Sequence, residues 1–359
     1  MYGLDNLPFG AAEGRLWVRY GDGALDLSAA AARGAVDERL AASTLNPFLA
    51  GGRPLWTSTR AALRKLEFTN LTPVDELSMT LPFEVADYVD FYSSEQHAIN
   101  ASRILRPNSP GITPNWKHLP IGYHGRSGSV VVSGTDIVRP HGQWRDPDGV
   151  PEYGPTRRLD VECEVGFVVG VPSDGPVPTA AFREHVFGVV LLNDWSARDI
   201  QAWEMAPLGP FLGKSFATSI SPWVVPLDAL EAARITAPAQ DPPVLPYLRD
   251  DRTGYDLRLT LEVNGTVLTR PPFHQMYWTA AQQLAHMTVN GANVRTGDLY
   301  ASGTVSGSDP DELGCLLELY RNTRYLADGD TVTISATAPG PDGSVIGLGE
   351  VSGTIRPAR

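Results

Sequence analysis

The chain contains little cysteine, no long hydrophobic run and no excess of positive charge. Its 359 residues include two cysteines, Cys163 and Cys315, which cannot form a disulfide framework. We therefore expect both to be buried small side chains of a protein in a reducing cytoplasm. Apolar runs such as residues 187–192 are far too short to span a bilayer. The first ten residues also lack the basic and apolar regions of a secretion signal.

The charge balance excludes two classes of partner. Lys and Arg total 29 against 41 Asp and Glu, which gives a net charge of −12. We therefore expect no nucleic-acid partner and no anionic membrane partner. A small anionic substrate remains compatible with this balance, because a binding site can be locally positive.

Two familiar catalytic motifs are absent. The sequence Gly213-Lys214-Ser215 ends like a phosphate-binding loop, but that motif needs a glycine at position 208, where the chain has Leu208. A nucleophile elbow would need glycine at position 129, which is Ser129. These mismatches argue against nucleotide binding and against an α/β-hydrolase serine.

The composition and patterning predict a mainly β fold with some α. Thirty prolines and 35 glycines are scattered through the chain and favour short strands and turns. Asn264-Gly265 between alternating apolar residues predicts a tight hairpin, and Thr279 with Gln282 predicts the capped start of a helix. Beyond a small N-terminal unit the chain is strand-rich, as in GSVVVSGTDIV, RLDVECEVGFVVG, DLRLTLEVNGTVLTR and DTVTISA.

Several acids stand in apolar surroundings. Asp160, Glu162 and Glu164 alternate along one expected strand, and the simplest interpretation is a half-buried strand with a wet face. A divalent cation is the alternative, because neighbouring carboxylates repel each other unless a positive charge lies between them. Asp90 and Asp194 are further acids beside aromatic residues. If these acids converge, a ligand set of oxygens alone favours Ca²⁺, Mg²⁺ or Mn²⁺.

A helix expected over residues 196–204 presents two donors on one face. Arg198 and Gln201 are three residues apart, so both side chains can reach one oxygen-rich ligand. Alternatively, Arg198 pairs with a nearby acid on a solvated face. Lys214 follows a segment rich in proline and glycine, which suits either a lysine held in a pocket or a surface lysine beside a turn.

One histidine stands beside other reactive groups. His97 follows Asp90 and Tyr92 within a few residues. A histidine that acts as a general base needs an acid to orient it, and Glu318 in the late segment ELGCLLEL offers one.

These residues belong to segments that together resemble the fumarylacetoacetate hydrolase family. The match runs in order through the whole chain, including the N-terminal unit. The segments that carry it are TLNPFLAGGRPLW, YVDFYSSEQHAINASRI, PNWKHLPIGYHGRSGSVVVSGT, LDVECEVGFVVG, NDWSARDIQAWEMAPLGPFLGKSF, MYWTAAQQLAHMTVNG and LYASGTVSG.

The resemblance implies an SH3-like barrel over residues 1–82 and a mixed β-sandwich roll, the catalytic domain, over residues 83–359. It also implies a cytoplasmic homodimer that hydrolyses the carbon–carbon bond of 4-fumarylacetoacetate to fumarate and acetoacetate. That reaction is the last step of tyrosine and phenylalanine breakdown. A related hydrolase of diketo acids such as acylpyruvates is the alternative. The N-terminal unit and the long central block argue against this alternative.

The resemblance also assigns roles to individual residues. His97 matches a base that activates water, and Glu318 matches the acid that orients it. Arg198 and Lys214 match groups near the reacting oxygens. A divalent cation, Ca²⁺, Mg²⁺ or Mn²⁺, would be held by Asp90, Glu162, Glu164 and Asp194. A second cation would lie near Asp194, Lys214 and Thr218. The positions that match substrate contacts are Tyr92, Arg106, Tyr123, Gln201 and Thr304.

One position departs from the family pattern. The family usually places a substrate-contacting tyrosine at the position of Met205. A lost phenol hydroxyl removes one hydrogen bond, on the order of 0.5–1.5 kcal/mol. We therefore expect a change in affinity or specificity here, without loss of the reaction.

Overall fold

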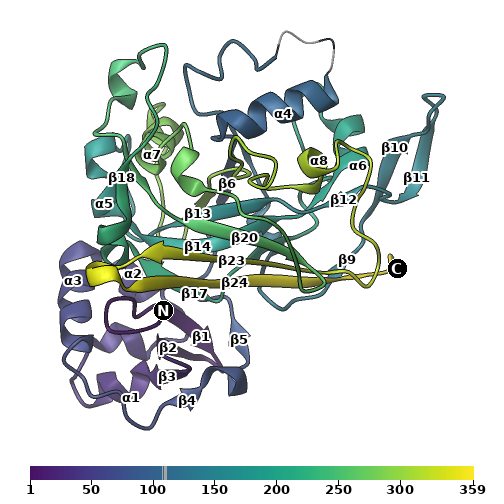
Figure 1. Ribbon diagram of the computed structural model, residues 1–359. Coiled ribbons are helices and arrows are strands. Elements are labelled where there is room, and N and C mark those ends of the chain that lie inside the picture. Colours follow the sequence, from purple (N-terminus) through teal and green to yellow (C-terminus); the bar gives the residue numbers. More distant parts are fainter. Residues whose placement is uncertain (107, 109–110) are drawn as a thin grey trace.

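Two stacked β-sheets form the centre of the protein in the computed structural model, which describes residues 1–106, 108 and 111–359 (Figure 1). Within the described residues the larger sheet has 13 strands. Its main path runs through β4 (Thr72–Pro73), β3 (Gly23–Asp26), β2 (Arg15–Tyr20), β1 (Phe9–Ala12), β17 (Trp223–Pro226), β14 (Val186–Asp194), β13 (Cys163–Val169), β22 (Leu299–Ala301), β6 (Tyr88–Phe91) and β7 (Gly122–His124). Three strands lie off this path: β5 (Met79–Thr80), β8 (Val130–Val132) and β16 (Thr218–Ile220).

The smaller sheet has five strands in the described residues and packs against the larger one. Their order is β21 (Thr266–Thr269), β20 (Arg258–Val263), β23 (Thr331–Pro339), β24 (Val345–Arg356) and β9 (Ile137–Val138). The remaining strands form two-stranded pairs: β10 (His141–Arg145) with β11 (Pro151–Pro155), β12 (Leu159–Asp160) with β15 (Ser196–Ala197), and β18 (Arg234–Thr236) with β19 (Thr253–Tyr255).

Strands β13 and β14 are buried throughout because both of their faces are covered. Phe167 and Leu191 belong to the core shared with β20, β23 and β24. Val168 and Val190 point the other way, into a second core shared with the N-terminal unit. All nine residues of β14 are buried. The run at residues 187–192 is therefore a central strand, as expected for a sheet covered on both sides.

The N-terminal unit lies at the lower left in Figure 1 and extends the larger sheet at one end. Strand β1 pairs with β17, with Phe9 opposite Val224. The Phe9 ring lies 5.4 Å from the ring of Phe48 and 5.7 Å from that of Phe187, measured between centroids. These aromatic contacts join the unit to β14.

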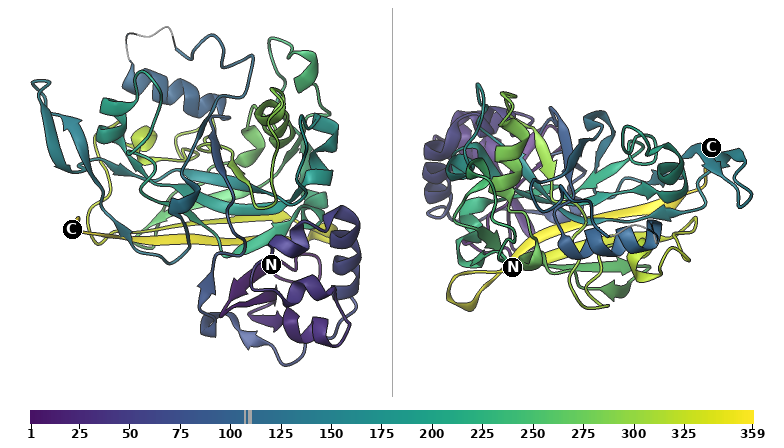
Figure 2. Two further views of the ribbon diagram at one scale, coloured as in Figure 1. Left: turned by 180° about the vertical axis from the view of Figure 1, so that it is seen from behind. Right: turned by 90° about the horizontal axis from the view of Figure 1, so that it is seen from above.

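The α-helices are few and mostly short, and three of them carry candidate site residues. They are α1 (Leu27–Ala32), α2 (Asn46–Leu49), α3 (Gly52–Leu63), α4 (Glu95–Leu105), α5 (Phe182–His185), α6 (Arg198–Glu204), α7 (Ala280–Thr288) and α8 (Leu316–Leu319). Helices α4, α6 and α8 lie on the same side of the sandwich (Figure 1). Seen from behind, the β10–β11 hairpin stands away from the body, at the end opposite the N-terminal unit (Figure 2).

The structure confirms the mainly β class and both local signals. Asn264 and Gly265 have φ of 53° and 73°, the left-handed pair of a tight hairpin turn, and they join β20 to β21. Thr279 and Gln282 form the expected capping box of α7. No helix of the described residues is long and apolar enough to cross a membrane. The SH3-like form of the N-terminal barrel stays a prediction.

Candidate functional site

Four acids from three parts of the chain meet in one buried cluster. Asp90 lies on β6, Glu162 directly precedes β13, Glu164 lies on β13, and Asp194 ends β14. One carboxylate oxygen of each lies within 4.8 Å of the others, and all four residues are buried. The wet face predicted for the strand 159–165 is therefore wrong, because every residue of that segment is buried. Its acids point into the protein.

Two buried cations contact these acids. The Lys214 ammonium lies 2.6 Å from Asp194 Oδ2 and also pairs with Glu162 Oε2. Arg198 Nη2 lies 2.7 Å from Glu162 Oε1. Lys214 and Arg198 are each 5% exposed. The alternatives of a surface lysine and of an arginine on a solvated face are therefore both wrong.

Three further candidate residues border the same cluster. The Tyr123 hydroxyl donates to Asp194 Oδ2 at 2.7 Å, and Thr218 Oγ1 donates to Asp194 Oδ1 at 3.2 Å. Gln201 Oε1 accepts from Arg198 Nη1 at 3.3 Å. Residues near the beginning and at the end of the segment 193–218 thus lie around one carboxylate cluster.

The electrostatics of the carboxylate cluster fit the binding of a divalent cation. Burial, reinforced by neighbouring carboxylates, raises the pKa of Asp90 and of Glu164 well above their usual range. Asp90 Oδ1 and Glu164 Oε1 are buried without a hydrogen-bond partner in the described part of the chain. Burial also opposes ionisation of Glu162, but Arg198 and Lys214 outweigh it and lower the pKa of that carboxyl. Unpartnered carboxylate oxygens in a buried site are suitable ligands for a hard divalent cation.

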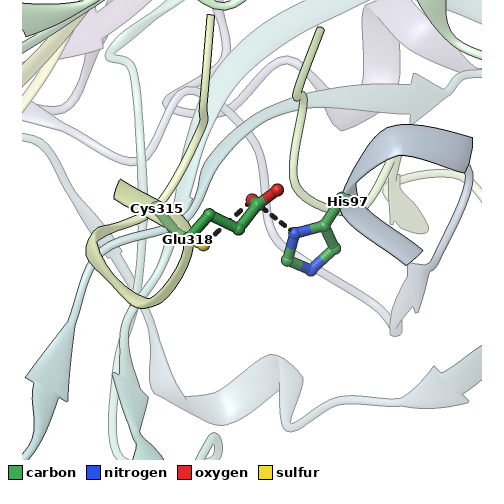
Figure 3. Close-up of side chains that lie close together, drawn as sticks. All are labelled: His97, Cys315 and Glu318. Carbon is green, nitrogen blue, oxygen red and sulfur yellow. Dashed lines mark hydrogen bonds and ion pairs between the residues drawn. The ribbon is translucent and has the colours of Figure 1, made fainter. Parts of the chain in front are cut away.

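His97 and Glu318 form a second cluster beside the first. His97 Nδ1 lies 2.6 Å from Glu318 Oε2 (Figure 3). Glu318 also accepts from Asn100 Nδ2 at 2.9 Å, from Ser306 Oγ at 2.7 Å and from Cys315 Sγ at 3.1 Å. Burial opposes ionisation of Glu318, but the His97 charge and these hydrogen bonds lower its pKa to about 2. The ionised Glu318 therefore accepts the Nδ1 proton of His97, which leaves Nε2 as the acceptor of the neutral ring.

The other three predicted substrate contacts differ in their surroundings. The Tyr92 ring stands edge-on to the His97 ring, with 5.2 Å between the ring centroids. Thr304 is buried, and its hydroxyl has no hydrogen-bond partner in the described residues. Arg106 follows the last residue of α4 and is exposed.

One acid that the sequence does not single out as a site residue links the two clusters. Asp160 is fully buried and accepts from Arg198 Nε at 2.8 Å. It also accepts from the backbone N–H groups of Leu316 at 2.8 Å and Leu317 at 3.1 Å, at the start of α8. That helix carries Glu318. The only sequence signal for Asp160 is its alternation with the acids at 162 and 164. Asn100 has a clearer signal, because it lies one helical turn after His97.

A cavity of about 370 Å³ lies beside the carboxylate cluster. Asp194 and Lys214 form part of its wall, and Arg126 and Phe211 lie among its other lining residues. The carboxylate cluster is therefore reached from the loops that follow β7 and α6.

Comparison with known proteins places this site in a family. The family described as "Fumarylacetoacetate (FAA) hydrolase C-terminal" matches residues 88–356, and "Fumarylacetoacetase N-terminal" matches residues 5–82. Fumarylacetoacetase of Arabidopsis thaliana is 42% identical over 99% of this chain and 96% of its own length. The Rattus norvegicus enzyme of the same name shows the same identity and coverage.

Solved structures show the same fold at low sequence identity. Fumarylacetoacetate hydrolase from psychrophilic Exiguobacterium antarcticum superposes with a TM-score of 0.63, at 17% identity over 99% of both chains. Maleylpyruvate hydrolase from Sphingobium, solved in complex with manganese (II) ion and pyruvate, gives a TM-score of 0.60 at 16% identity, over 98% of this chain and 100% of its own. Two family descriptions that together span nearly the whole chain, with relatives of 42% identity over nearly their full length, show that the chain belongs to the fumarylacetoacetate hydrolase family.

Proposed function

We propose that the protein hydrolyses the carbon–carbon bond of 4-fumarylacetoacetate to give fumarate and acetoacetate, the final step of tyrosine and phenylalanine catabolism. The observation that carries this proposal is the buried His97–Glu318 contact of 2.6 Å beside four converging carboxylates. Relatives named fumarylacetoacetase that match almost the full chain support the choice of substrate.

His97 is the proposed general base. The scissile bond joins a carbonyl carbon to the carbon between two carbonyls, and water alone attacks such a carbonyl slowly. With Nδ1–H held by Glu318, Nε2 takes a proton from water as the oxygen attacks the carbonyl next to the alkene. Tyr92 packs against the ring and limits its rotation.

The proposed role of the buried cations is to stabilise negative charge. Cleavage expels acetoacetate as an enolate, which is a poor leaving group in water. Arg198 and Lys214 lie on the carboxylate cluster with their charges already oriented, and such preorganised charges stabilise the developing anion. Gln201, held by Arg198, and Tyr123 offer further donors to the substrate oxygens.

A divalent cation fits the acids of the site. Asp90, Glu162, Glu164 and Asp194 would hold it, and the unpartnered oxygens of Asp90 and Glu164 support this assignment. When bound, a hard cation such as Ca²⁺, Mg²⁺ or Mn²⁺ supplies Lewis-acid stabilisation of oxygen charge. Lys214 and Thr218 beside Asp194 are the proposed neighbours of a second cation.

The assembly and domain arrangement are proposals as well. We propose a cytoplasmic homodimer. The exposed apolar side chains of Leu208 (97%), Phe211 (58%) and Leu212 (50%) support the dimer as contact residues. The two free thiols suit a reducing cytoplasm. The division into domains 1–82 and 83–359 is supported by family matches that end at residue 82 and begin at residue 88.

Turnover by the purified protein tests the proposal. We expect loss of diketo-acid absorbance when fumarylacetoacetate is added, and a much slower rate after treatment with a chelator. His97→Ala should lower kcat by roughly 10²–10⁴-fold, the usual contribution of a general base. His286→Ala is the matched control, since this histidine bonds Tyr247 and lies in neither cluster.

Two results would contradict separate parts of the proposal. Turnover of acylpyruvates with no turnover of fumarylacetoacetate would mean that the substrate is wrong. Turnover that a chelator leaves unchanged would remove the cation from the reaction while sparing the role of His97.

A further inference from the structure

Three different ligand atoms converge at the catalytic histidine. His97, Cys315 and Glu318 are all buried, and the imidazole Nδ1, the thiol Sγ and a carboxylate oxygen lie within 4.8 Å of one another. The imidazole and the thiol both point at the same oxygen, Glu318 Oε2, at 2.6 and 3.1 Å (Figure 3). Ser306 Oγ also donates to this oxygen, at 2.7 Å, so three protons meet at a single acceptor.

This donor set differs in kind from the carboxylate cluster next to it. The four acids offer oxygen only, which favours hard cations. Nitrogen, sulfur and oxygen together are the ligands of Zn²⁺ and of similar softer cations, and three protein ligands leave one coordination position open.

We propose that His97, Cys315 and Glu318 form a second, inhibitory metal site for Zn²⁺ and softer divalent cations, distinct from the carboxylate cluster. Metal binding changes the positions of two protons. The thiol proton leaves to solvent, and the ring proton moves from Nδ1 of His97 to Nε2 as the metal takes Nδ1. Glu318 Oε2 exchanges its hydrogen bonds from His97 and Cys315 for one metal bond and keeps the hydrogen bond from Ser306.

Inhibition follows from the new position of the ring proton. With Nδ1 bound to metal, Nε2 of His97 carries a proton and cannot accept one from water. This consequence rests on the proposed role of His97, whereas metal binding itself does not.

The chain supplies its own control thiol. Cys163 is also free and fully buried, but it lies on β13 within the hydrophobic core and belongs to no candidate metal group of the described residues. Cys163→Ala therefore removes a buried thiol without touching the proposed site. Cys315→Ser removes the sulfur ligand but keeps a hydroxyl that can donate to Glu318.

Zn²⁺ inhibition is measured on the full-length protein with saturating Mg²⁺ to fill the carboxylate cluster, and each variant is compared with its own Zn²⁺-free rate. We expect Cys315→Ser to raise the half-inhibitory Zn²⁺ concentration by at least about tenfold, because loss of even an outer-shell partner costs roughly 10–100-fold in metal affinity. Cys163→Ala should match the wild type. Equal Zn²⁺ sensitivity in Cys315→Ser, or inhibition relieved in proportion to added Mg²⁺, would overturn the proposal.

Cd²⁺ binding gives a readout that needs no turnover. Titration with Cd²⁺ should produce an ultraviolet thiolate-to-metal charge-transfer band in the wild type and in Cys163→Ala, and none in Cys315→Ser. If the band follows this pattern while fumarylacetoacetate is not hydrolysed, the metal site stands and only the proposed function fails. A band of equal size in Cys315→Ser, or no band in the wild type, would exclude the site.

Discussion

Replacing Asp160 by asparagine tests whether the two clusters act as one site. Asp160 Oδ2 accepts from Arg198 Nε and from the Leu317 N–H, while Oδ1 accepts from the N–H groups of Leu316 and Val161. Asparagine has one acceptor oxygen and one NH₂ group, so it can satisfy only one of these two sets. The other set then faces a donor instead of an acceptor.

The size of the effect follows from burial. Asp160 is fully buried and Arg198 is 5% exposed, and breaking a buried pair costs about 3–5 kcal/mol. Because Glu162 still holds Arg198 at 2.7 Å, we expect the lower end, about 3 kcal/mol in the free energy of unfolding. A shift of about 1 Å in a catalytic group costs roughly 100-fold. We therefore expect a kcat loss of that order, with a smaller change in KM.

Urea unfolding and steady-state kinetics measure the two effects separately. Asp199→Asn is the matched control, since Asp199 also accepts from backbone N–H groups, those of Arg157 and Ile200, but bonds no residue of either cluster. The control should lose stability and keep its kcat. If Asp160→Asn keeps kcat within twofold of the wild type, Asp160 does not position Arg198 or Glu318 for the reaction.

Two further predictions concern stability. Glu318 has a folded pKa of about 2 against an ordinary 4.5, so its stabilisation, on the order of 3 kcal/mol, is complete above pH 4.5 and is lost as the pH falls toward 2. Unfolding free energies of Glu318→Gln should therefore fall less than those of the wild type over that range, and parallel curves would contradict this. Gly303 has φ of +76°, and an added Cβ would lie 2.1 Å from the Phe91 carbonyl oxygen. Gly303→Ala should therefore lower the free energy of unfolding by more than about 1 kcal/mol. Gly128 has open space around it, so Gly128→Ala should not have this effect. Equal urea midpoints of the two variants would refute the prediction.

Much of the fold could be predicted from local sequence. The Asn264-Gly265 turn and the Thr279 cap are decided by residues within a few positions of each other, and the apolar alternation gives the mainly β class. The wet face expected for residues 159–165 is wrong for a non-local reason. That face is covered by segments distant in sequence, including the bridge between Glu162 and Cys315.

The site itself depends on pairing across the chain. Asp90 reaches the other acids because β6 pairs in parallel with β22, which in turn pairs with β13. No spacing in the sequence specifies that register. The sequence does not reveal the role of Asp160 for the same reason, since the backbone partners of this side chain lie 156 and 157 residues away.

The excess of negative charge in the site explains the positions of the Arg198 and Lys214 side chains. Five carboxylates, those of Asp90, Asp160, Glu162, Glu164 and Asp194, are buried together, and among the described residues only Arg198 and Lys214 are paired with them as cations. If all ionise, the formal excess is three negative charges, which a buried site does not tolerate. The raised pKa values of Asp90 and Glu164 show where the excess falls.

A divalent cation held by Asp90, Glu162, Glu164 and Asp194 would reduce the excess to a single negative charge. Arg198 and Lys214 are then held in place, because Arg198 is the only cation that pairs with Asp160 in the described residues and Lys214 pairs with both Asp194 and Glu162. The same groups that make the buried acids tolerable are therefore held rigidly where the enolate charge of the proposed reaction develops. Under the proposed mechanism, stability and catalysis depend on one set of ion pairs, which is why the substitution of Asp160 is expected to lower both.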